Sequence, residues 1–216
     1  MLANAGPNPT RSAAGLVGCV GWQTARDGVA YCLDGQVYTV GAAVSWLQRV
    51  GLIREPTELD LAASAVDSCD GVIFVPGLAG LAAPFWAPEA RGAFVGLSLA
   101  TEREHLVRAV LEGIAAQVAW LLRGIESDLG APVARLRVDG GVARSNELLQ
   151  LQADLAQVPV EVYPSPHATA VGVAELGGAP VQAWTPVRVV EPRVGASDAA
   201  ARLNAWRRAA EATLTR

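Results

Sequence analysis

The longest regular pattern of apolar and polar residues runs from about residue 102 to residue 129. Apolar side chains recur there every three or four positions, which is the spacing of one face of an α-helix. Thr101 and Glu104 stand at the start of this pattern with the spacing of a capping box. We therefore predict one helix of roughly 40 Å, at about 1.5 Å per residue. Its apolar positions are Leu106, Val110, Leu111, Ile114, Val118, Leu121, Leu122 and Ile125.

Shorter patterns on both sides of this helix predict further strands and helices. The apolar runs near the start are joined by connections too short for crossovers, so we expect antiparallel strands there. Later apolar runs alternate with helical patterns, as in βα units. Residues 78–92 predict an ordered loop, and 179–197 an irregular, proline-rich segment. The predicted strands are 15–23, 28–35, 36–41, 71–77, 133–141 and 158–164, and the other predicted helices are 41–53, 57–67, 146–157, 167–178 and 198–214.

Local signals refine some of these elements. Thr57 and Asp60 have capping-box spacing at the start of one helix, and Ser197 is the expected cap of the last one. In the strand at 158–164, Glu161 alternates with valines and is expected to face outward. The helix at 167–178 consists mostly of small residues, which suits close packing.

The order of elements, antiparallel strands first and βα units later, predicts an α/β fold. We expect a mixed sheet covered by helices on both faces. The chain has 216 residues, of which 51% are hydrophobic, and this is enough for one globular domain with its own core. We assign residues 15–216 to that domain and residues 1–14, rich in Pro, Asn and Ala, to an irregular N-terminal segment.

Charge and hydropathy argue against two classes of partner. The formal net charge is −4 and the basic residues, all arginines, form no run, so nucleic acid is not expected as a main partner. No apolar run reaches the roughly 18 residues of a membrane span. The first residues lack the basic and apolar regions of a signal peptide. These features predict a cytoplasmic protein that does not bind membranes.

Cysteines and histidines are few and show no spacing typical of a site. Cys19, Cys32 and Cys69 form no close pair, which argues against a disulfide framework. His105 and His167 lie far apart, and a metal site needs three or four convergent ligands, so no metal site is expected. His105 lies beside the apolar face of the long helix and is interpreted as a packing residue. No catalytic residue is assigned from these patterns.

The stretch Asp139-Gly140-Gly141 ends one predicted strand and precedes a helix. In open α/β sheets, ligands bind where strands end and loops lead into helices. Two glycines leave the backbone bare, and Ser145 and Asn146 add polar groups at the helix start. Two interpretations remain open. The glycines form a tight turn with Ser145 as the helix cap, or a flat polar ligand lies on the backbone.

Gly41 stands at a second junction, between the run at 36–41 and the helix that follows. The free N–H groups and the dipole of a helix N-terminus suit a phosphate group. A structural turn is the alternative here as well. Two glycine-opened helices in one small α/β domain favour a nucleotide as the ligand.

Several segments resemble the C-terminal half of the FGGY family of carbohydrate kinases. The segment 71–117 resembles the region that holds the family's C-terminal signature. "RVDGGVARSNELLQLQADLAQVPVE" at 137–161 resembles the adenosine-binding segment, and "CLDGQVYTVGAAVSW" at 32–46 is similar to another family segment. "GLAAPFW" at 80–86 resembles the form found in glycerol kinases more than the form found in xylulokinases.

The resemblance implies an actin-like ATPase fold of the ribonuclease H-like kind. It also implies ATP-dependent phosphorylation of a polyol or sugar, with glycerol as the expected substrate and Mg²⁺ bound through the nucleotide. Ser45 stands where glycerol kinases have a nucleotide-contacting Gln, and Ser145 where many have Asn. The residues that the resemblance assigns to ATP or ADP are Gly41, Ser45, Gly140, Gly141, Ser145 and Asn146.

In this family the substrate-binding residues, the general-base Asp and the first phosphate loop belong to an N-terminal domain. The chain is therefore expected to be inactive alone and to need an N-terminal kinase domain in cis or in trans, with a homo-oligomer as a further option. Two alternatives remain open. The chain belongs to a kinase for another sugar such as xylulose, or it is a stand-alone, non-catalytic interaction domain.

Overall fold

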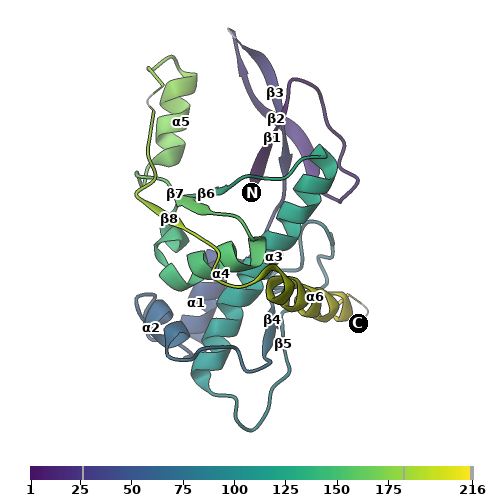
Figure 1. Cartoon of the computed structure of the whole chain (residues 1–216), viewed down its shortest axis with the longest axis vertical. Helices are drawn as coiled ribbons and strands as arrows, with labels where there is room; N and C mark the ends of the chain where they lie inside the picture. Colours follow the sequence, from purple (N-terminus) through teal and green to yellow (C-terminus); the bar gives the residue numbers. More distant parts are fainter. Residues whose placement is uncertain (26, 182, 215–216) are drawn as a thin grey trace.

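The computed structural model describes residues 1–25, 27–181 and 183–214, arranged as Figure 1 shows. The helices are α1 (Gly41–Arg49), α2 (Glu58–Ser64), α3 (Arg103–Leu129), α4 (Asn146–Ala156), α5 (Ala168–Leu176) and α6 (Ala196–Ala212), with a short 3-10 helix at Gly141–Arg144. The strands are β1 (Leu2–Gly6), β2 (Val17–Thr24), β3 (Gly28–Asp34), β4 (Ile73–Val75), β5 (Ala93–Val95), β6 (Leu136–Val138), β7 (Val160–Val162) and β8 (Arg188–Val190).

The long helix predicted from the apolar pattern is confirmed as α3, and it lies at the centre of the core. Buried residues such as Val107, Val110 and Ile114 pack in the largest cluster, Leu122 packs in a second, and Leu121 with Ile125 packs in a third. By length and apolar character α3 could cross a membrane, but 72% of its most apolar stretch is buried inside the molecule. Its apolar character is therefore that of a core helix.

Gly113 lets α3 lie directly against β4. A Cβ atom at Gly113 would stand 2.2 Å from the carbonyl oxygen of Phe74, so only glycine fits there without a shift. The same oxygen accepts a hydrogen bond of 3.2 Å from the indole nitrogen of the buried Trp206 in α6. Phe74 also packs on Phe94, with ring centroids 4.8 Å apart. This contact joins α3, α6 and the β4–β5 pair.

The strands form three separate sheets among the described residues, whereas the sequence predicted one mixed sheet. Their strand orders are β1-β3-β2, β4-β5 and β6-β7-β8. The first is antiparallel, as expected from its short connections. The third is mixed, because β6 and β7 are parallel and β7 and β8 are antiparallel. In Figure 1, α3 passes beside all three sheets, which lie at different points along its length.

Residues 2–6 form a strand at the start of the segment 1–14 that the sequence predicted to be irregular, whereas residues 7–14 form no helix or strand. β1 pairs with β3 along Leu2–Gly6, and the amino group of Met1 donates a 2.8 Å hydrogen bond to the carbonyl of Gly35. The composition LANAG has weak strand propensity, so its pairing with a distant strand decides the structure. The strand predicted at 36–41 is absent, because the described chain there runs as coil into α1.

The caps predicted for α2 and α3 are wrong. At the start of α3 the capping residue is Glu102, whose backbone N–H donates to Nδ1 of His105 over 3.0 Å, so His105 closes the helix end. Thr57 makes no side-chain cap at α2. At α3 several residues near the helix start can serve as the cap, and the spacing alone does not choose among them.

Other corrections fall in the C-terminal half. The cap position of α6 is Gly195 and not Ser197. Glu161 in β7 is buried, because Arg135 and Arg137 reach it over 2.7 and 3.2 Å. β8 lies in the stretch 179–197 that was predicted to be irregular, of which residue 182 is outside the described part.

The helix α5 was expected to pack closely, yet none of its residues is buried. Figure 1 shows it standing apart from the other helices. Val173 and Leu176 expose 64% and 55% of their surface. Its small side chains therefore have no complete packing partner among the described residues.

We predict that replacing Gly113 with Ala lowers the free energy of unfolding by about 1–3 kcal/mol, because the added methyl group overpacks the contact with β4. The measurement is urea denaturation followed by circular dichroism. Gly172→Ala in α5 is the matched control, since its Cβ would meet nothing within 4 Å. We expect it to stabilise slightly, by about 0.5–1 kcal/mol. Equal effects of the two substitutions on stability would contradict the close approach of α3 to β4.

Candidate functional site

The turn after β6 presents bare backbone to open space. Gly140 has φ of 90° and ψ of −178°, a conformation that residues with side chains rarely adopt. A Cβ atom placed on Gly140 or Gly141 would meet no atom within 4 Å. Both glycines are exposed. The pair therefore makes the turn into the 3-10 helix and leaves room for a ligand against the main chain.

The second glycine junction, at Gly41, faces this turn. A Cβ atom at Gly41 would lie 3.8 Å from Cγ2 of Val142, the residue that follows the glycine pair. Gly41 is the first residue of α1, and the preceding Val40 provides no side-chain cap. The fold thus brings the two glycine-opened helix starts side by side, although they are about 100 positions apart in the sequence.

Ser45 lies one turn further along α1, on the same side of the helix as Gly41. Its hydroxyl is exposed and donates to the carbonyl oxygen of Gly41 over 3.4 Å. This is a long and weak hydrogen bond. The hydroxyl is therefore free to exchange its local partner for a polar ligand group.

Ser145 has a structural role as the cap of α4. Its hydroxyl accepts a hydrogen bond from the Leu148 N–H over 3.1 Å and donates to a carboxylate oxygen of Asp60 over 2.5 Å. The other oxygen of Asp60 accepts from the Asn146 N–H over 2.6 Å. The interpretation of Ser145 as a helix cap is confirmed. Asp60, predicted to cap its own helix, instead ties α2 to the start of α4.

Asn146 is exposed, and its side-chain oxygen accepts a hydrogen bond from Arg188 of β8. This contact places the side-chain oxygen of Asn146 toward β8, so its NH2 group points away from β8. Asn146 is the first residue of α4 and follows the 3-10 helix that begins at Gly141. Its assignment to a nucleotide stays a prediction.

A cavity of about 250 Å³ adjoins the glycine turn. Its walls come from the ends of the parallel strands β6 and β7, the place where ligands bind in such sheets. Sequence reasoning missed Arg144, the cationic residue in the wall, and Tyr163 with its neighbours up to residue 166. Their position directly after the second parallel strand is the signal that could have identified them.

The thiols of Cys69 and Cys32 are poor nucleophiles. Burial, followed by the neighbouring Glu112, raises the pKa of Cys69 far above that of a free thiol. Burial and a hydrogen bond with Cys19 raise the pKa of Cys32 to about 11. In the described part of the chain, no three His, Cys, Asp or Glu side chains gather in a way that could hold a metal ion. The site offers backbone groups, hydroxyls, an amide and an arginine, which can bind a polar ligand without reacting with it.

The fold and the site thus define an α/β domain with an open cavity at the ends of two parallel strands. The model of the FGGY family of carbohydrate kinases, C-terminal domain, matches residues 1–180. The chain belongs to this family, as the sequence resemblance predicted, and its fold is the actin-like ATPase fold of these kinases.

Individual relatives agree with this assignment. The glycerol kinase of Bordetella parapertussis is 40% identical over 225 residues, covering 98% of this chain. A crystal structure of Plasmodium falciparum glycerol kinase with ADP superimposes with a TM-score of 0.90 at 32% identity, over 99% of this chain and 45% of that one. The xylulose kinase of Rhodospirillum rubrum has a TM-score of 0.71 at 29% identity, over 86% of this chain and 40% of that one. The chain spans 44% of the length of the Bordetella relative.

We predict that Ser145→Ala lowers the free energy of unfolding by about 1–2 kcal/mol, because it removes a helix cap and leaves a carboxylate oxygen of Asp60 without its donor. The control is Ser45→Ala, whose exposed hydroxyl makes one weak local bond, and which should change stability by less than about 0.5 kcal/mol. Thermal or urea denaturation of both variants provides the comparison. A Ser145→Ala variant as stable as Ser45→Ala would rule out the structural role.

Proposed function

We propose that this chain forms the nucleotide-binding wall of an ATP-dependent polyol kinase, with glycerol as the substrate of the complete enzyme. The observation on which this depends is the juxtaposition of Gly41 with the turn at Gly140 and Gly141. Family membership supports a kinase, and the relatives that are named glycerol kinases support glycerol. The higher TM-score with a glycerol kinase than with the xylulose kinase favours glycerol over xylulose.

The geometry fits a nucleotide of the ATP or ADP type. In our proposal the adenosine lies on the bare backbone of Gly140 and Gly141, where a side chain would otherwise stand. The phosphates lie toward the uncapped start of α1 at Gly41, with Ser45 one turn beyond. Asn146 supplies an amide at the edge, and Ser145 holds the start of α4 in place.

ATP would supply the phosphoryl group, and Mg²⁺ bound to its phosphates would neutralise charge during transfer. This chain's residues bind and orient the nucleotide. Phosphoryl transfer also needs groups that position the acceptor hydroxyl and take its proton. We infer that these groups belong to the N-terminal part of the family's kinases, in cis or in trans, and that the chain alone is inactive.

Isothermal titration with ADP tests the nucleotide site. We predict that the unaltered chain binds ADP and that Gly141→Val weakens binding at least about tenfold, or by 1.4 kcal/mol, because the side chain fills the space over the backbone. Gly195→Val is the matched control, since Gly195 is an exposed glycine at a helix start with the same open surroundings. Equal ADP affinities of the Gly141→Val and Gly195→Val variants would contradict the assignment of the nucleotide site to this turn.

Steady-state assays with ATP and glycerol test whether turnover depends on an N-terminal kinase part. We predict that the chain alone forms no ADP. We assign none of its described residues as the base that takes the proton from the acceptor hydroxyl. Adding the N-terminal portion of the Bordetella parapertussis glycerol kinase should restore turnover that depends on both components. Turnover by the isolated chain would contradict the proposal of inactivity.

A further inference from the structure

Cys19 and Cys32 lie directly opposite each other on the neighbouring strands β2 and β3. Their sulfur atoms are 3.3 Å apart, and both cysteines are free. The two residues are 13 positions apart in the sequence, where their spacing is not typical of any site. The antiparallel pairing of the β2–β3 hairpin therefore creates a pair of thiols that the cysteine spacing did not predict.

The backbone places this pair within the range of a disulfide bond. Directly opposite residues of an antiparallel pair have Cα atoms about 4.5 or about 5.5 Å apart, depending on their hydrogen-bond position. Disulfide bonds span Cα separations of roughly 4.4–6.8 Å, so either value is suitable. The pairs on both sides, Gly18 with Leu33 and Val20 with Tyr31, keep the same register. A bond between the sulfur atoms thus requires small rotations of two side chains and no shift of the strands.

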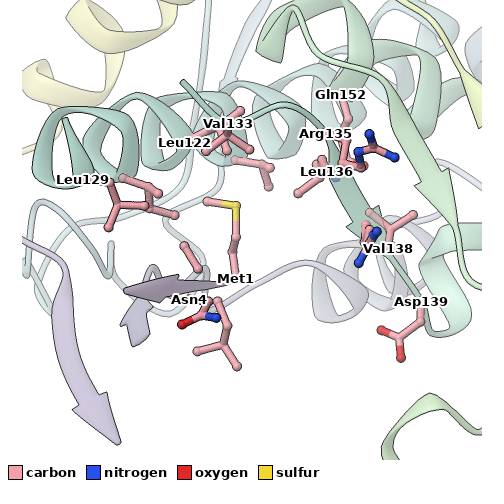
Figure 2. Close-up of a pocket in the computed structure, with 15 residues that line it drawn as sticks. Met1, Asn4, Leu122, Leu129, Val133, Arg135, Leu136, Val138, Asp139 and Gln152 are labelled. Carbon is pink, nitrogen blue, oxygen red and sulfur yellow. The ribbon is translucent and has the colours of Figure 1, made fainter. Parts of the chain in front are cut away.

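The two thiols differ in their access to solvent. β2 is the outer strand of its sheet, and Cys19 on it is partly exposed. β3 is the middle strand, and Cys32 on it is buried. The register partners of Cys32 are Cys19 on one side and, on the other, Asn4 of β1, in the wall of a cavity of about 600 Å³ (Figure 2). A small oxidant therefore reaches Cys19 first.

Cys69 has different surroundings and provides a comparison within the same chain. It is buried, and its thiol donates to a carboxylate oxygen of Glu112 over 3.2 Å. Arg202 forms an ion pair with the same carboxylate. The other two cysteines contact each other, so Cys69 has no sulfur partner in the described part of the chain.

We propose that Cys19 and Cys32 form a reversible disulfide bond in the native hairpin, by exchange with a low-molecular-weight disulfide such as glutathione disulfide. The Cys19 thiolate attacks one sulfur of that disulfide, which gives a mixed disulfide on Cys19 and releases one glutathione. Cys32 then loses its proton to solvent, attacks the Cys19 sulfur and releases the second glutathione. Two protein thiols are oxidised, one glutathione disulfide is reduced to two thiols, and excess thiol reverses both steps.

Two opposing effects set the rate of the second step. The raised pKa of Cys32 slows it, because the thiolate is the nucleophile. Contact between the two sulfur atoms accelerates it, because groups held within reach react as if at high concentration. Cys32 therefore reacts with the Cys19 sulfur in preference to glutathione in solution. This site is independent of the proposed nucleotide site, since it involves the hairpin alone.

Incubation of the reduced chain with glutathione disulfide, followed by alkylation and mass spectrometry, tests the proposal. Trypsin cleaves after arginine, and Arg26 stands between the two cysteines, so Cys19 and Cys32 fall in separate peptides. We expect these peptides to become joined at least about tenfold faster than Cys69 forms a mixed disulfide with glutathione. In concentrated urea Cys69 loses its burial, and the difference should shrink.

Alanine variants separate the roles of the thiols. Cys32→Ala should stop at the mixed disulfide on Cys19, whereas Cys19→Ala should leave the buried Cys32 largely unmodified. Cys69→Ala is the matched control and should form the same joined peptides as the unaltered chain. If a variant fails to fold, the peptides of the unaltered chain decide the question.

Thermal denaturation measures the effect of the bond on the fold. A disulfide across the hairpin restricts the unfolded chain, so we expect oxidation to raise the melting temperature by at least about 2 °C. Cys19→Ala treated in the same way should show no rise. The proposal is overturned by joined peptides that come from two copies of the chain, by a Cys69 that reacts as fast as the pair, or by an oxidised form whose melting temperature does not rise.

Discussion

The structure depends on the burial of the middle of α3, where most side chains are buried. A helix that contributes to three clusters of buried residues must be approached by several elements at once, and each approach sets the position of one element. At Gly113 the approach is so close that the Phe74 carbonyl occupies the place of a side chain. The same carbonyl receives the Trp206 indole, so one backbone atom of β4 relates α3 to α6.

The candidate site takes its geometry from this frame through polar contacts at its edge. Asp60 of α2 binds both the Ser145 hydroxyl and the Asn146 N–H, which fixes the start of α4 against α2. Arg108 of α3 adds a 3.2 Å ion pair to Glu147, one residue into α4. The glycine turn between β6 and α4 is thus held at its α4 end. A preorganised turn loses less conformational entropy when a ligand binds, which is the physical advantage of placing it there.

The sequence predicted elements with strong periodicity and missed those that depend on distant partners. The apolar spacing of α3 and the glycines at the strand ends are local signals, and they predicted the central helix and a ligand site. The strand β1 consists of residues with weak strand propensity and exists because β3 pairs with it. The burial of Glu161 depends on two arginines of the chain's other segments. Likewise, local spacing could not show that Asp60 would bind the start of α4.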